Sequence, residues 1–253
     1  MNIVSGFADI SLLQLLLVAA MALFASLVGG LAGYGTGALM PLILVPMVGA
    51  APVVPIIAIS AMFSNTARVT AFRRSVDPRR VVVALSVALP ACALGAWLYT
   101  LLTGRGAALV IGTTLIATVP LRRLLKRRGL HLGEKGFFVG AAGWGLLMGG
   151  TTGAGVIMLS VLMATGLEGA AVIATDAAIS VVTGVIKVGV FAAAGVLTPK
   201  VIAVGFLIGA VTFPCTFLAK LIVERLPVHV HTVLLDAVVI VGGLVMIAGA
   251  FSA

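Results

Sequence analysis

The chain has 253 residues, of which 62% are hydrophobic and only 9% are charged. This composition excludes an ordinary soluble domain, in which about 25% of the residues are charged, and is typical of a polytopic membrane protein. The formal net charge of +9 does not indicate nucleic-acid binding, because the basic residues gather in two short loops. Such loops report how a membrane protein is oriented in the lipid bilayer.

A transmembrane helix needs about 20 apolar residues, so the chain has room for about eight to ten spans joined by short loops. No basic residues precede the first apolar segment, and we expect it to be a retained span rather than a signal peptide. The predicted fold class is therefore an all-α polytopic membrane protein. In chain order, the apolar segments are residues 10–28, 38–48, 53–72, 81–102, 107–121, 137–148, 156–164, 170–194, 201–223 and 230–251.

Two glycine-rich segments, residues 29–41 and 149–158, interrupt the apolar runs. Glycine tolerates backbone conformations that end a helix, so each segment predicts a broken or re-entrant helix. Unwound backbone inside a membrane must be buried by protein or reached by water, and a pair of such breaks indicates a transporter's binding site. The alternative is close helix packing through small residues. The candidate substrate-binding residues in these segments are Gly35, Thr36, Gly37, Thr151, Thr152, Gly153 and Gly155.

Two apolar segments carry a polar stripe at helical spacing. In residues 170–194, one helix face carries Asp176, Ser180, Thr183 and Lys187. The acid and the base of this stripe lie about 16 Å apart along the helix, which is too far for a direct ion pair. The corresponding stripe in residues 53–72 consists of Ser60, Ser64, Asn65 and Arg68.

Two fixed cations, several hydroxyl groups and the N-termini of broken helices together suit an anion. We therefore expect Arg68 and Lys187 to bind a sulfur or phosphorus oxyanion or a carboxylate. The alternative is that both side chains extend to the lipid headgroups, since each lies within about two turns of a helix end. Asp176 has two interpretations, as a proton-coupling acid or as the structural partner of a neighbouring helix.

Matching elements recur after about 120 residues, which predicts two homologous halves. The first membrane repeat is residues 1–121, a basic connector is residues 122–135, and the second repeat is residues 136–253. The loop at residues 73–80 and the connector are separated by two spans, so they lie on the same side, which the positive-inside rule makes cytoplasmic. Whether the halves are parallel or inverted depends on whether each glycine-rich break crosses the membrane once or twice.

Motifs for catalysis or metal binding are missing from the sequence. It contains no Gly-x-Ser-x-Gly, no His-Glu-x-x-His and no paired aspartates, so we do not expect an enzyme. A cation site would need several converging acids or histidines, so neither a metal nor another cofactor is expected. The two cysteines, Cys92 and Cys215, are expected to be small buried residues.

Three features of the sequence resemble the sulfite exporter TauE/SafE family of bacterial membrane proteins. They are the Gly33-x-Gly35-x-Gly37 pattern with the proline-containing apolar run after it, the basic loop from Arg73 to Asp77, and the repetition of the plan. This resemblance covers nearly the whole chain. It implies a two-repeat secondary transporter of the bacterial inner membrane, which exports sulfite, an organosulfonate or a similar sulfur-containing anion through a central site. The alternative substrate is another small anion such as a carboxylate.

Overall fold

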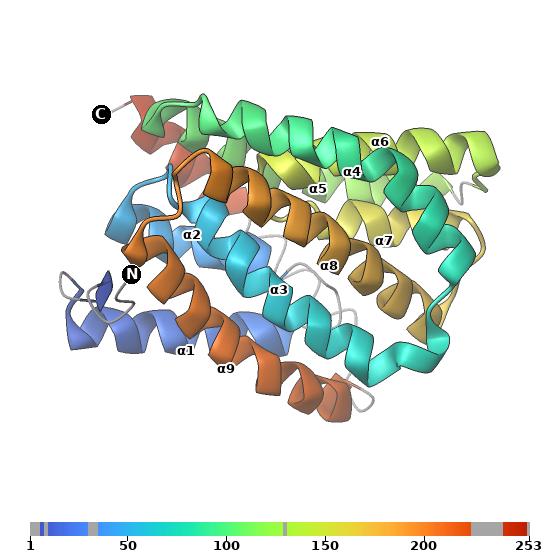
Figure 1. Cartoon of the computed structure of the whole chain (residues 1–253), viewed down its shortest axis with the longest axis horizontal. Coiled ribbons are helices and arrows are strands. Elements are labelled where there is room, and N and C mark those ends of the chain that lie inside the picture. The colour runs from blue at the N-terminus through green and yellow to red at the C-terminus, as the bar shows by residue number, and fades with distance from the viewer. Residues whose placement is uncertain (1–5, 8–9, 30–34, 129–130, 224–239, 252–253) are drawn as a thin grey trace.

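The structure, a computed structural model, describes residues 6–7, 10–29, 35–128, 131–223 and 240–251. The described residues form helices joined by short connections, with no strands (Figure 1). The elements are α1 (Leu12–Gly29), α2 (Gly35–Val48), α3 (Val53–Phe72), the 3-10 helix η2 (Arg73–Ser75), α4 (Pro78–Thr100), α5 (Gly104–Arg128), α6 (Glu134–Gly150), α7 (Gly155–Ala164), α8 (Gly169–Ala193) and α9 (Pro199–Val223), followed by a last helix at Ile240–Phe251.

Five helical segments in the described part are long and apolar enough to cross a membrane: Val53–Ser75, Pro78–Thr100, Gly104–Leu121, Gly169–Ala193 and Pro199–Leu218. Shorter apolar helices accompany them, among them α2 and α7, which each begin inside a glycine-rich segment. The predicted all-α polytopic class is confirmed. The homology of the two halves stays a prediction.

The glycine-rich segments separate helices. In the second, α6 ends at Gly150 and α7 begins at Gly155. Between them the backbone is extended at Thr151 and then passes through Gly153, whose φ of +82° favours glycine. The predicted break is therefore confirmed there. In the first segment, α1 ends at Gly29 and α2 begins at Gly35, while residues 30–34 lie outside the described part.

The two helices with polar stripes, α3 and α8, pack side by side in the middle of the bundle (Figure 1). Around them, α9 packs on α3 and α4 packs on α8. In a second layer of contacts, α1 packs on α2 and α9, and α6 packs on α4. This arrangement turns the two stripes of polar side chains away from lipid and toward the protein interior.

Glycines allow α4 and α6 to approach closely. A Cβ added to Gly145 would lie 2.6 Å from the carbonyl oxygen of Ala88, and one added to Gly95 would overlap the carbonyl oxygen of Leu146. Gly149, which begins the second glycine-rich segment, packs in the same way on Cys92. The glycine at the start of this segment thus serves close helix packing, whereas the residues after it form the break between two helices.

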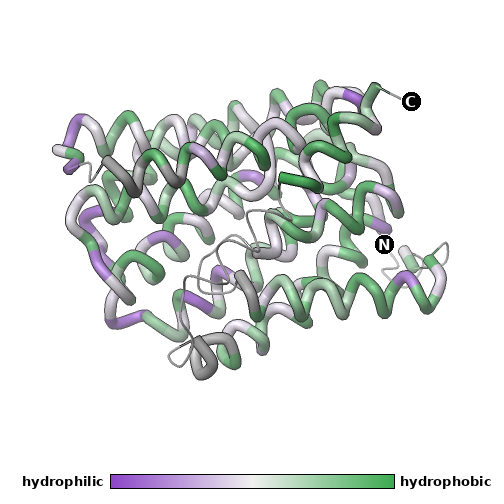
Figure 2. Tube along the Cα trace, turned by 180° about the vertical axis from the view of Figure 1, so that it is seen from behind, coloured by the Kyte–Doolittle hydropathy of each residue, from purple (hydrophilic) through white to green (hydrophobic). Residues whose placement is uncertain are grey.

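Hydrophilic residues gather at one end of the bundle, while hydrophobic residues dominate the long helices (Figure 2). At the start of α4, Nη2 of Arg79 donates a hydrogen bond of 2.5 Å to Oε1 of Glu134, at the start of α6. The loop at residues 73–80 and the connector at residues 122–135 thus meet at one end, as the spacing of the spans predicted. That this end is cytoplasmic stays a prediction.

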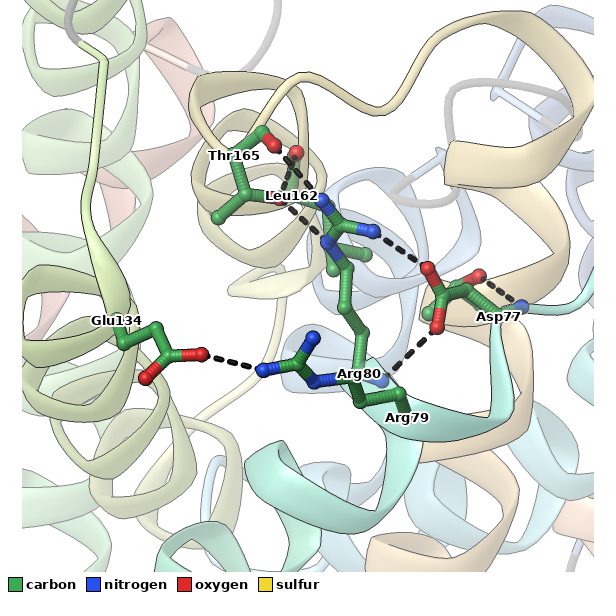
Figure 3. Close-up of polar contacts among 7 residues, drawn as sticks. Asp77, Arg79, Arg80, Glu134, Leu162 and Thr165 are labelled. Atoms are coloured by element: carbon green, nitrogen blue, oxygen red, sulfur yellow. Dashed lines mark hydrogen bonds and ion pairs between the residues drawn. The ribbon is translucent and has the colours of Figure 1, made fainter.

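A polar cluster at the same end joins α4 to α7 and α8 (Figure 3). The Asp77 carboxylate caps α4, because it accepts a hydrogen bond of 3.0 Å from the backbone N–H of Arg80. It also accepts a hydrogen bond of 2.5 Å from Nη1 of Arg80. Arg80 in turn donates to the hydroxyl and carbonyl oxygens of Thr165, just after α7, at 2.9 and 2.8 Å. The backbone N–H of Asp77 donates to Oγ1 of Thr175, on α8, at 3.0 Å. The hydrogen bond from the Arg80 backbone lowers the pKa of Asp77, and the Arg80 guanidinium lowers it further.

Gly145→Ala is expected to lower the free energy of unfolding by about 1–3 kcal/mol, because the new methyl group overlaps backbone atoms that cannot rotate away. Gly143→Ala is the matched control, since a Cβ there meets nothing within 4 Å. Both replacements bring the same gain in helix propensity to α6. Their thermal midpoints in detergent measure the difference, and equal midpoints would contradict the close approach of α4 and α6.

Asp77→Asn is expected to lower the thermal midpoint at neutral pH, because asparagine keeps a capping oxygen but loses the charge that Arg80 stabilises. A carboxylate with a lowered pKa stabilises the fold above its ordinary pKa, and this stability is lost as the pH falls through the lowered value. The difference in thermal midpoint between the variant and the wild type should therefore shrink as the pH falls below about 4. Glu134→Gln, in an exposed ion pair, should have little effect at any pH. A gap that stays constant into acid would refute a charge-based role for Asp77.

Candidate functional site

A cavity of about 50 Å³ lies where α3 and α8 meet the start of α2 and the connection between α6 and α7. The first turns of α2 and α7 both line it, so two helix N-termini converge there. Ten of the predicted site residues line this cavity: Thr36, Gly37, Ser64, Asn65, Arg68, Thr151, Thr152, Gly153, Gly155 and Lys187.

Three predicted residues do not line the cavity. Gly35 is buried one position before Thr36. Thr183 donates its hydroxyl to the carbonyl oxygens of Ile179 and Ser180, within its own helix, at 2.9 and 3.3 Å. Asp176 is fully buried behind Arg68. Polar spacing along one helix groups such residues on a face but does not show which of them reach the open space.

Lys187 is buried with only 3% of its surface exposed. Its Nζ donates to the carbonyl oxygens of Met148 and Thr151, at 2.6 and 2.8 Å, where α6 ends. The last carbonyls of a helix have no partner within it, and the ammonium supplies one. An ammonium has three N–H donors, so one remains for the cavity. Lys187 therefore does not extend to the lipid headgroups.

Arg68 is buried with 4% exposure, so the headgroup alternative fails here as well. Its Nη1 lies 3.2 Å from Oδ2 of Asp176, and its Nη2 donates to Oδ1 of Asn65. The ion pair joins α3 to α8, which is the structural role considered for Asp176. A guanidinium has five N–H donors, so Arg68 keeps donors for a ligand. The other carboxylate oxygen of Asp176, Oδ1, is buried without a hydrogen-bond partner in the described part of the chain.

The two glycine-rich segments touch beside the cavity. Oγ1 of Thr152 donates a 2.5 Å hydrogen bond to the carbonyl oxygen of Gly37, and a Cβ on Gly37 would lie 2.9 Å from the backbone nitrogen of Gly153. Oγ1 of Thr151 is buried and has no hydrogen-bond partner among the described residues. An unpaired buried hydroxyl costs about 1–3 kcal/mol, so a ligand or water that binds it gains that energy.

Some contributors carry no signal that sequence reasoning could use. Met148 takes part through its backbone carbonyl, which every residue has. Trp144 donates its indole N–H to the carbonyl oxygen of Ala154 at 3.1 Å and so holds the turn between α6 and α7. A tryptophan in an apolar helix is ordinarily interpreted as core packing. These contacts become visible only when α6 is placed against α7 and α8.

The arrangement provides donors for an anion rather than ligands for a cation. The described residues contain no group of three or more histidines, cysteines or acids that could hold a metal ion. One small space is surrounded by the Arg68 guanidinium, the Lys187 ammonium, backbone N–H groups at two helix starts and the unpaired hydroxyl of Thr151. In a dry interior such donors bind anionic oxygens strongly.

Comparison with known proteins gives one match. The family model described as Sulfite exporter TauE/SafE matches residues 18–246. The matched region includes all the residues that line the cavity. No curated protein and no solved structure gives a significant match.

Proposed function

Because the chain belongs to the sulfite exporter TauE/SafE family, we propose that it exports sulfite or a related small sulfur-containing anion through the cavity between α3 and α8. Membership of this family, together with the candidate membrane spans, identifies the chain as a multi-pass membrane permease. In our proposal it is a secondary transporter of the bacterial inner membrane that works without a cofactor. The end that carries Arg79 and Glu134 faces the cytoplasm.

The observation that carries this proposal is the pair of buried cations beside one cavity. The oxygens of an oxyanion accept hydrogen bonds from the free N–H of Lys187, from Arg68 and from the unpaired hydroxyl of Thr151. Charged residues are rare within membrane helices and mark ion pathways. The backbone N–H groups of Thr36 and Gly37, at the start of α2, supply further donors.

The size of the cavity favours a compact substrate. A water molecule needs about 10–15 Å³ on the same scale, so a cavity of about 50 Å³ holds about four heavy atoms. Sulfite has one sulfur and three oxygens, whereas an organosulfonate needs more room. The alternative substrate, a small carboxylate, also has few heavy atoms but offers two oxygens rather than three. Competition between the two anions distinguishes these substrates.

The two halves of the chain supply matching parts of this site. In each half, a short helix that follows a glycine-rich segment is succeeded by a helix with a polar stripe and then by one that begins at a proline. In our proposal residues 1–121 and 136–253 are homologous repeats joined by the connector at residues 122–135. Movement of one repeat against the other opens the cavity to either side of the membrane in turn.

Asp176 is the proton-coupling acid of this proposal. It is the carboxylate in contact with a cavity cation, and its Oδ1 is unpaired in the described part of the protein, which leaves a place for a proton. A proton there weakens the attraction between Asp176 and Arg68 and so changes how strongly α3 is held to α8.

Arg68→Ala and Lys187→Ala are each expected to reduce the rise in thermal midpoint that a fixed concentration of sulfite causes, and to slow sulfite transport in liposomes, because each removes one of the two buried cations beside the cavity. A ligand that binds only the folded protein raises its midpoint, so the ligand-dependent shift reports binding even where the variant itself is less stable. Arg79→Ala, which changes an exposed side chain at the end of the bundle, is the control.

The same midpoint shift is measured with five other ligands: sulfate, thiosulfate, taurine, acetate and chloride. Normal sulfite transport by both alanine variants would disprove the site. A selective shift with acetate would replace sulfite by a carboxylate as the substrate.

Asp176→Asn is expected to slow sulfite transport driven by a pH gradient more than it slows exchange of labelled sulfite at equal pH. The gradient assay needs a group that takes up and releases a proton, whereas exchange needs only the binding site. Asp77→Asn is the control, because it removes a carboxylate in the polar cluster at the end of the bundle. If the two assays lose the same fraction of activity, Asp176 does not couple protons to transport.

A further inference from the structure

The charges around the cavity do not cancel. Arg68 and Lys187 each bring one positive charge, and Asp176 brings one negative charge as the partner of Arg68. Lys187 has only carbonyl oxygens as hydrogen-bond acceptors, and no other charged side chain lines the cavity among the described residues. The empty site therefore carries a net charge of about +1 while Asp176 is ionised.

We propose that this charge selects the substrate: the loaded cavity is neutral, so it takes a monovalent oxyanion while Asp176 is ionised and a divalent one once Asp176 is neutral. This inference rests on the proposed anion site and adds the charge of its substrate. Asp176 does not line the cavity, so it acts on the anion through its charge and through Arg68. It is a specificity-determining residue that does not touch the substrate.

The physical reason is the cost of a buried charge that lacks a partner. Lys187 is 3% exposed, and backbone carbonyls stabilise its ammonium only in part. A monovalent anion supplies the missing charge. A divalent anion leaves an extra negative charge in a water-poor interior, where unpaired charges are strongly disfavoured. Removal of the Asp176 charge reverses this preference.

Within the ranges that the structure describes, few other charged or titratable groups lie near Asp176 and could change the net charge of the cavity. Arg68, on α3, is in direct contact with it. Two titratable residues from the α4 region bond to α8 elsewhere: Asp77 donates its backbone N–H to Thr175, and the neutral thiol of Cys92 donates to the carbonyl oxygen of Thr183. Lys187 lies on α8 itself. Of these, Arg68 and Lys187 line the cavity.

Chlorate and sulfite are suitable probes, because each has a central atom with three oxygens in a pyramid and they differ by one unit of charge. Binding of each ion to the purified protein is measured by calorimetry, in buffer only slightly alkaline, in which most of the sulfite is divalent and the Lys187 ammonium keeps its proton. The quantity of interest is the change between variants in the ratio of the sulfite affinity to the chlorate affinity, since the two ions match in shape and in the number of acceptor oxygens. The wild type is expected to prefer chlorate under these conditions.

A series of variants changes the charge of the cavity in known steps. Asp176→Asn raises it to +2 and should increase the ratio by about tenfold or more, because one repulsive unit charge is removed at short range. Lys187→Gln lowers it to zero and should decrease the ratio by a similar factor. The double variant Arg68→Gln with Asp176→Asn keeps the charge at +1 and should retain the wild-type ratio.

The double variant also serves as the folding control, because it removes the buried ion pair as a unit and leaves no unpaired carboxylate. If Asp176→Asn does not fold, the comparison of Lys187→Gln with the double variant decides the question. A ratio that is the same in every variant overturns the charge rule while the anion site stands. If neither ion binds the folded wild type, the proposed function fails and the charge rule fails with it.

Discussion

The structure depends on how a helix that ends inside the protein satisfies its last carbonyl groups. No water is available in the hydrocarbon region, so each unpaired carbonyl there costs several kcal/mol. At the end of α6 the partner is the ammonium group of Lys187, which accounts for the carbonyls of Met148 and Thr151. This contact fixes α8 against the second glycine-rich segment, and so it positions the wall of the cavity. The positive charge that the cavity offers to an anion is thus a consequence of ending a helix at this place.

The ion pair between Arg68 and Asp176 has a different role, because it joins the two central helices. A buried ion pair adds little net stability compared with apolar packing, but loss of one partner is strongly destabilising. The pair therefore keeps α3 and α8 in register while it leaves donors of Arg68 beside the cavity. Arg68 therefore both holds two helices together and faces the cavity, so experiments that change Arg68 must separate folding from binding.

Sequence reasoning predicted the polar stripes and the glycine-rich breaks because both are local: a period of 3.6 residues places side chains on a face, and clustered glycines end helices. It grouped Thr183 with the cavity residues, although the Thr183 hydroxyl bonds to its own helix. It also left the partner of Asp176 undecided, since the pairing with Arg68 requires α3 to lie against α8. The carbonyl partners of Lys187 could not be predicted at all, because a backbone oxygen leaves no mark on the sequence.

The contact between Gly37 and Gly153 has a consequence for how the protein moves. Side chains that interlock must separate when two elements shift, whereas Gly37 and Gly153 meet each other through backbone atoms, with the side chains of Thr152 and Leu115 at the edge of the contact. The hydrogen bond from Thr152 to Gly37 is the polar restraint described between them, and a single bond of this kind is worth only about 1 kcal/mol. The point where the two glycine-rich segments meet is therefore held by backbone contact and one described hydrogen bond, which restrain a shift less than interlocked side chains do.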